Sequence, residues 1–173
     1  MKTAFFAAAL ALIAAGPPAP ASAAADAPQR TTVTFVHPEK FTDVKDRYYP
    51  TDAGRDGILR QIKDYIVQLG DRLLPPGYHL AMTFTNIDLA GEFEPWHGAQ
   101  WDDVRIVKPI YPPRFKFSYS VTDPAGKVLK QGSENDTDMD FDLQPTLDNQ
   151  DPLRYEKAFL GTWIRGHLAH LKG

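Results

Sequence analysis

The sequence has no cysteine among its 173 residues. This absence excludes disulfide cross-links, thiol catalysis, cysteine-ligated metals and a lipid attached to an N-terminal cysteine. The folded chain is therefore expected to depend on packing alone for its stability. Its length suits one domain with a substantial hydrophobic core.

The chain also lacks a block of positive charge and every common catalytic signature. Its formal net charge is −3 at pH 7, and a mildly acidic domain without a basic patch argues against nucleic acid as a partner. The motifs G-x-S-x-G, H-E-x-x-H and S-x-x-K and a glycine-rich phosphate loop are all missing. No cofactor is expected, and the sequence names no reaction.

The N-terminus has the three parts of a cleavable signal peptide. Lys2 supplies a positive start, residues 4–15 are uniformly apolar, and residues 21–23 (ASA) are the small residues that signal peptidase recognises. The apolar run is shorter than the roughly 20 residues that span a bilayer. We expect cleavage after Ala23, with Ala25 as the alternative, and a periplasmic product that has no anchor and no membrane span.

After cleavage, residues 24–31 are expected to be a disordered tail and residues 32–173 a single domain. Apolar side chains recur three and four residues apart over residues 52–74 and again after Asp151, which predicts two amphipathic helices. Thr51 or Asp52 can cap the first helix. Asp151 can cap the second, with Pro152 at its first position.

Five segments have the composition or the alternation of strands. The alternation slips near residues 85–86, which predicts a β-bulge there. One apolar face and one polar face are typical of an antiparallel sheet. The sequence thus predicts an α+β fold: a mainly antiparallel sheet of about five strands with both helices packed on one face. A mixed sheet stays open, because the first strand could pair in parallel after the first helix. The predicted strands are residues 32–36, 78–87, 104–107, 114–122 and 127–132.

Five stretches of the sequence stand out as a set: residues 33–43 (VTFVHPEKFTD), 86–91 (NIDLAG), 104–114 (VRIVKPIYPPR), 138–141 (DMDF) and 153–163 (LRYEKAFLGTW). Together they resemble a family of exported bacterial proteins of unknown function, DUF3016. The resemblance implies a proteobacterial, periplasmic protein; it implies no activity and carries over no functional residue.

The first candidate site is the long loop at residues 90–103 (AGEFEPWHGAQWDD). Long loops in compact domains are often binding loops, and exposed tryptophans beside carboxylates suit stacking on a sugar or a cationic group. In the alternative, Trp96 and Trp101 fold inward and cover the sheet edge. The candidate ligand-binding residues are Trp96, Trp101, Glu92, Glu94 and His97.

The second candidate is an acidic run in which every second residue from 134 to 142 is Asp or Glu. In an extended chain these carboxylates share one face and could bind Ca²⁺. Phe141 and Leu147 stand where a calcium loop needs glycine and a bidentate acid, so the run is no EF-hand. The alternative is a solvated run that keeps a sheet edge from pairing. The candidate metal ligands are Asp136, Asp138 and Asp140.

Two further pairs have a functional and a structural interpretation. His167 and His170 lie three residues apart on the second helix and could face one metal, but histidine near a helix C-terminus also interacts favourably with the helix dipole. Asp88 and Arg105 could form an acid–base pair or a buried ion pair. The structural interpretation is favoured for both.

Export, an aromatic–acidic loop and the lack of a catalytic set favour a non-enzymatic binding or accessory module of the cell envelope. Its partner would be an envelope protein or glycan. One alternative is a hydrolase acting on an envelope glycan or peptide, which needs two carboxylates facing each other across a cleft. Another is a calcium-stabilised structural domain. The oligomeric state stays open. The carboxylates available to the hydrolase are Asp88, Glu92, Glu94, Asp102 and Asp103.

Overall fold

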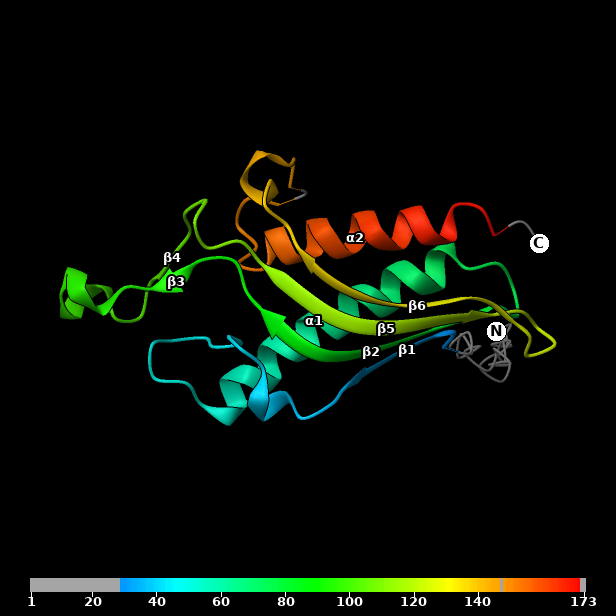
Figure 1. Cartoon of the computed structure of the whole chain (residues 1–173). Helices are drawn as coiled ribbons and strands as arrows, with labels where there is room; N and C mark the ends of the chain where they lie inside the picture. The colour runs from blue at the N-terminus through cyan, green and yellow to red at the C-terminus, as the bar shows by residue number, and fades with distance from the viewer. Residues whose placement is uncertain (1–28, 147, 172–173) are drawn as a thin grey trace, which may run out of the picture.

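The computed structural model describes residues 29–146 and 148–171. Four strands form the main sheet and two short strands form a second sheet, and two α-helices complete an α+β fold (Figure 1). The predicted signal peptide and residues 24–28 of the predicted tail lie outside the described residues. No helix in the described part of the chain is long and apolar enough to cross a membrane.

The main sheet has the strand order β1-β2-β5-β6. β1 pairs in parallel with β2, and the other two pairings are antiparallel. The sheet is therefore mixed, because a helix connects the first two strands and returns the chain to the same end. The strands are β1 (Thr31–Phe35), β2 (His79–Asp88), β5 (Arg114–Thr122) and β6 (Val128–Thr137).

The prediction of about five strands in one sheet is wrong. The strand expected at residues 104–107 shortens to β4 (Arg105–Ile106), which pairs with β3 (Glu92–Phe93) apart from the main sheet. Pro109 follows shortly after β4 and has no N–H for a ladder, so β4 cannot extend toward β5. The expected bulge is confirmed, since the β2–β5 register shifts between residues 84 and 86.

Helix α1 (Asp52–Leu73) begins and ends close to its predicted limits. The Thr51 hydroxyl accepts a hydrogen bond from the N–H of Gly54 at 3.0 Å and so caps the helix. Helix α2 (Arg154–Leu168) begins later than expected. The Asp151 carboxylate accepts from the N–H of Leu153 at 2.8 Å and thus stabilises the preceding turn instead of the helix start.

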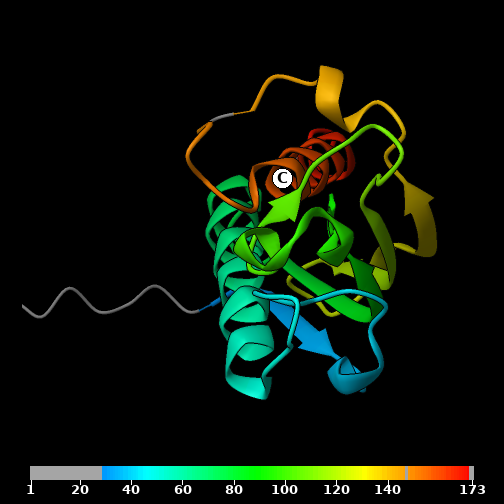
Figure 2. The same ribbon diagram turned by 90° about the vertical axis from the view of Figure 1, so that its left-hand side faces the viewer.

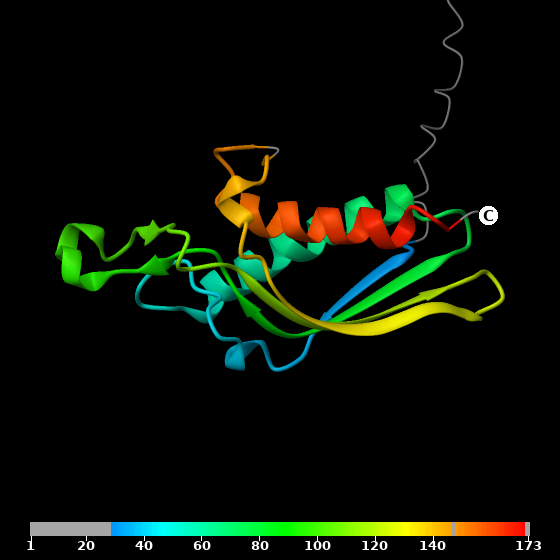
Figure 3. The ribbon, with the colours of Figure 1, turned by 45° about the horizontal axis from the view of Figure 1, so that its top comes forward.

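Both helices lie on the same side of the main sheet (Figure 3). Their buried residues and those of the strands form one hydrophobic cluster. The sheet is thus covered on one face, and β2 and β5 project at one end toward the segment that connects them. Central members of the cluster are Ile62, Ile66, Phe84, Phe115, Phe117, Leu160 and Ile164.

Candidate functional site

Residues 91–111 project from the main sheet as an arm (Figures 1 and 3). The N–H of Gly91 donates to the carbonyl of Tyr111 at 3.0 Å and closes the base of the arm. Strands β3 and β4 form its stem. The two 3-10 turns Pro95–His97 and Ala99–Trp101 form its tip, which Figure 2 shows facing the viewer.

Two glycines with positive φ shape the arm. Gly91 has φ 82° at the base, where a Cβ atom would lie 2.8 Å from the carbonyl oxygen of Ile106. Gly98 has φ 105° between the two 3-10 turns. Residues with side chains rarely adopt such angles, so both the base and the reversal at the tip depend on glycine.

The two tryptophans of the arm lie on its surface. Trp96 is 69% exposed and Trp101 is 44% exposed. The interpretation in which both fold inward over the sheet edge is therefore wrong. Phe93 and Glu94 are the buried residues here, at 3% and 1% exposed. Both predicted tryptophans are thus exposed, whereas Glu94, one of the two glutamates predicted beside them, is enclosed.

Glu94 is the centre of a hydrogen-bond network that holds the arm together. Lys108 Nζ donates to both carboxylate oxygens at 2.7 Å, and the Tyr111 hydroxyl donates to Oε1 at 2.8 Å. His97 Nε2 lies 2.7 Å from Oε2. The hydrogen bond from Lys108 is the main cause that lowers the pKa of Glu94. An ionised carboxylate therefore ties the tip to the base.

The network was not visible in the sequence, because its donors lie 14 and 17 residues beyond Glu94. Of the predicted site residues, His97 joins it. Glu92 does not, since its Oε1 accepts from the N–H of Phe93 at 2.9 Å. Glu94 cannot serve a hydrolase as a free acid or base, because donors occupy both of its oxygens.

Arg105 attaches the stem of the arm to the rest of the fold. Its Nη1 donates to Asp43 Oδ2 at 2.7 Å and to the carbonyl of Gly91 at 2.9 Å. Its Nη2 donates to the carbonyl of Lys45 at 3.1 Å. The Asp43 side chain is buried, so this is a largely enclosed ion pair that fixes the direction in which the arm leaves the body.

The ion pair expected between Asp88 and Arg105 does not form, because Arg105 pairs with Asp43 instead. Asp43 forms an isolated parallel bridge with Asp88, which brings the two acidic residues side by side. Burial, and then the nearby charge of Asp43, raise the pKa of Asp88. The long connection before α1 has no clear periodicity, so no pattern in it indicated that Asp43 would lie beside Asp88.

The three predicted metal ligands are not gathered around one point. Asp136 lies in β6, and Asp140 is exposed in the following turn. Asp138 is buried, and its two oxygens accept from the Gln144 side-chain amide at 2.9 and 3.0 Å. Within residues 29–146 and 148–171, no group of three or more His, Asp or Glu side chains is placed to hold a metal.

His167 and His170 lie in different surroundings. The ring of His167 stacks on Trp163 with centroids 3.8 Å apart, and its Nδ1 lies 2.9 Å from the Trp163 carbonyl. Its Nε2 lies 4.0 Å from Glu134 Oε1. His170 is exposed beyond the end of α2. His167 thus serves to pack α2 against the sheet.

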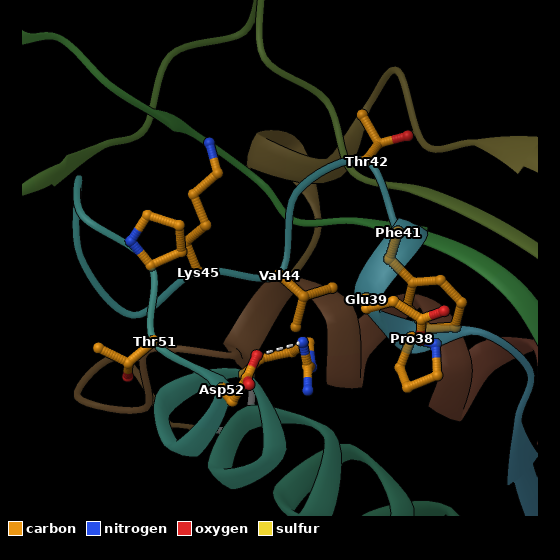
Figure 4. Close-up of a pocket in the computed structure, with 10 residues that line it drawn as sticks. Pro38, Glu39, Phe41, Thr42, Val44, Lys45, Thr51 and Asp52 are labelled. Carbon is orange, nitrogen blue, oxygen red and sulfur yellow. Dashed lines mark hydrogen bonds and ion pairs between the residues drawn. The ribbon is translucent and has the colours of Figure 1, made fainter.

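A shallow pocket of about 300 Å³ lies between the start of α1 and the preceding connection (Figure 4). Asp52 and Arg55 form an ion pair at 2.8 Å on its helix side, and Lys45 turns away from that pair. Glu39 and Lys45 lie close to His37 and Asp43, at 3.2 and 3.7 Å. The charged groups of the pocket therefore have partners, and the pocket does not define a binding site.

The comparisons with known proteins give one match. The family model described as "Protein of unknown function (DUF3016)" matches residues 29–166, which include every strand and both α-helices of the described residues except the last two residues of α2. No curated protein and no solved structure matches the chain.

Proposed function

Since the chain belongs to the DUF3016 family, whose description assigns no activity, we propose that it is a non-enzymatic binding module. In this proposal the chain is exported to the periplasm and contacts a protein of the cell envelope through the tip of the arm. The observation that carries the proposal is the exposure of two tryptophans on a segment held by a buried carboxylate.

Large apolar side chains are concentrated on the arm. Besides Trp96 and Trp101, Ile110 is 71% exposed and Val104 is 40% exposed. Each tryptophan can bury about 150–250 Å² on contact, and tryptophan is enriched among the residues that dominate binding energy. Exposed apolar groups gathered on one projection are typical of a protein-interaction site.

The Glu94 network makes this surface rigid before binding. Lys108 and Tyr111 hold the carboxylate from the base of the arm, and His97 contacts it from the tip. A preorganised surface loses less conformational entropy when a partner binds, so more of the contact energy remains as affinity. The network therefore supports binding even though its own groups are enclosed.

The apolar content favours a protein partner over a glycan. Val104 and Ile110 have no polar side-chain atoms and gain little beside sugar hydroxyls. The Glu94 oxygens are already occupied, which leaves Asp102 and Asp103 as the carboxylates near the tryptophans. A sugar stacked on Trp96 with these two acids as acceptors is the competing occupant, and the experiment below separates the two.

The export part of the proposal is supported by the signal-peptide pattern of residues 1–23. The mass of the protein recovered from the periplasm should correspond to cleavage after Ala23, or after Ala25. Leu10→Arg should interrupt the apolar run and leave the uncleaved chain in the cytoplasm. Leu129→Arg, in the exposed end of β6, is the matched control. Uncleaved wild-type protein in the cytoplasm would overturn export.

The partner surface can be tested by photo-crosslinking in cells that produce the full chain. A photoreactive phenylalanine analogue replaces Trp96 in one variant and Val128, an exposed residue of β6, in the control. We expect a discrete protein adduct at position 96 and none at position 128. Combining the probe with Trp101→Ala and Ile110→Ser should remove the adduct.

Three outcomes would contradict this proposal. Absence of any adduct at position 96, or an equal adduct at position 128, would show that the tip is not a specific contact surface. An adduct that glycan-degrading enzymes remove would show that the partner is a glycan and not a protein.

A further inference from the structure

A second cavity, of about 430 Å³, lies where the base of the arm meets the start of α2. Its volume is within the range of small-molecule sites, which is about 300–1,000 Å³. Part of its wall is apolar and comes from four different segments of the chain. The apolar side chains are Ile58, Leu89, Val107, Pro152 and Leu153.

Glu156, from α2, is the most unusual residue in this wall. It is 1% exposed, and its Oε1 accepts from the N–H of Ala90 at 2.8 Å. Its second oxygen, Oε2, has no hydrogen-bond partner within the described part of the chain. Burial raises the pKa of Glu156, which shifts its titration toward the neutral acid. In the neutral form the buried hydroxyl requires an acceptor.

The charged residues around the cavity are mainly positive. Lys45, Arg105 and Arg154 line it, and Asp46 and Glu156 are its acidic residues. Lys45 and Arg105 share one carboxylate, that of Asp43, at 3.7 and 2.7 Å, and Arg105 uses three hydrogen bonds of a guanidinium that has five N–H groups. The surroundings therefore favour a ligand that carries negative charge.

We propose that this cavity binds a small monocarboxylate with an apolar body. The apolar body lies against the aliphatic wall, and the ligand carboxylate accepts a hydrogen bond from the Glu156 acid and faces Lys45 and the two arginines. The site is distinct from the exposed tip of the arm, and the proposal does not depend on the proposed function.

The first test is calorimetric titration of the purified chain with octanoate at pH 6. Octylamine has the same body with a positive head and is the matched control. We expect octanoate to bind at least about tenfold more tightly than octylamine, a difference of about 1.4 kcal/mol. If octanoate does not bind, or if octylamine binds equally well, the proposal is overturned.

Two variants test whether octanoate binds inside the cavity. Val107→Trp fills the apolar part and should weaken octanoate binding at least about tenfold, or 1.4 kcal/mol. Val128→Trp adds the same ring on the exposed end of β6, far from the lining residues, and should leave binding unchanged. Circular dichroism checks that both variants fold. Unchanged binding in a folded Val107→Trp protein contradicts the assignment.

Glu156→Gln gives a test that does not depend on filling the cavity. The glutamine amide can still accept from Ala90 and donate to a carboxylate at every pH. Wild-type binding should weaken as pH rises, because an ionised Glu156 repels the ligand. Lys45, Asp46, Arg105 and Arg154 line the same space in both proteins. Binding by the variant should therefore be flat between pH 6 and 8, where octanoate is ionised, and an equal pH dependence in both proteins would exclude Glu156 from the site.

Discussion

The arm and the body of this protein each enclose one glutamate, and the two carboxyl groups behave in opposite ways. Glu94 and Glu156 are both 1% exposed. Three side chains surround Glu94, and the hydrogen bond from Lys108 lowers its pKa. Glu156 receives one backbone hydrogen bond, and burial raises its pKa. Burial alone therefore does not decide whether a carboxyl group is charged; the number and charge of its donors do.

The difference reflects how each region is held together. The body has a hydrophobic cluster drawn from both helices and the main sheet, so it can enclose a carboxyl group with a raised pKa without depending on it for stability. The arm has a two-residue pairing between β3 and β4 and a single deeply buried aromatic, Phe93. Its order therefore depends on the charged network around Glu94.

Replacing Trp163 tests whether the body is held together by its hydrophobic core. Trp163 is 9% exposed and packs edge-on against Phe117 and Tyr119, with centroids 5.1 and 4.7 Å apart. Trp163→Ala should lower the free energy of unfolding by about 3–5 kcal/mol, because it removes the ring and leaves a cavity. Urea unfolding followed by circular dichroism measures this. A loss below about 1 kcal/mol, small for a core residue, would contradict the assignment of Trp163 to the core.

The second prediction uses the pH dependence of Glu156. Its pKa is higher in the folded than in the unfolded state, so the folded state binds more protons and stability falls as pH rises above the unfolded value. The slope is at most about 1.4 kcal/mol per pH unit. Glu156→Gln should remove this slope, match the wild type in acid and exceed it at pH 8. Urea unfolding from pH 4 to 8 tests this, with Asp103→Asn as an exposed control that should follow the wild type.

The third prediction concerns the arm alone. Glu94→Gln keeps the shape of the side chain but loses the charge that faces Lys108. Amide hydrogen exchange in residues 92–111 should become faster at pH 7, while exchange in the main sheet should not change. Because the folded pKa of Glu94 is below its ordinary value of about 4.3, the stabilisation is lost as pH falls through that lowered value. The difference between variant and wild type should therefore disappear in acid.

Lys108→Met should reproduce the effect of Glu94→Gln on exchange in the arm, since it removes the other half of the same interaction. Asp103→Asn, an exposed acid in the arm, should not. Equal acceleration in the main sheet would show that the arm and the body do not open separately.

Local patterns predicted the body well. The spacing of Ile62, Ile66 and Leu69 placed α1, and the alternation from Phe115 to Val121 placed β5. These signals depend on neighbours within a few residues, where helix and strand geometry fix which side chains share a face. The slip in the alternation of residues 78–87 also located the bulge in β2.

The candidate sites could be predicted only in part, because they depend on contacts between distant residues. Glu94 meets Lys108 through the reversal at Gly98, and Glu156 meets Ala90 across 66 residues of sequence. One signal for Glu156 was present: it falls three residues after Leu153 and four before Leu160, on the apolar side of α2. An acid on such a stripe indicates a buried carboxyl, although not its partner.

Replacing the exposed tryptophans at the tip of the arm should change stability far less than replacing the buried Trp163. Trp96→Ala and Trp101→Ala should each change the free energy of unfolding by no more than about 0.5 kcal/mol, as exposed positions do. Urea unfolding measures this, with Trp163→Ala as the opposite case. The same variants should abolish the photo-adduct described above when the probe is placed at Ile110. A loss above about 1 kcal/mol, outside the usual range for surface substitutions, would show that the two rings pack on the body. In that case the exposed surface would belong to the structure of the arm, and its aromatic residues would no longer indicate a partner.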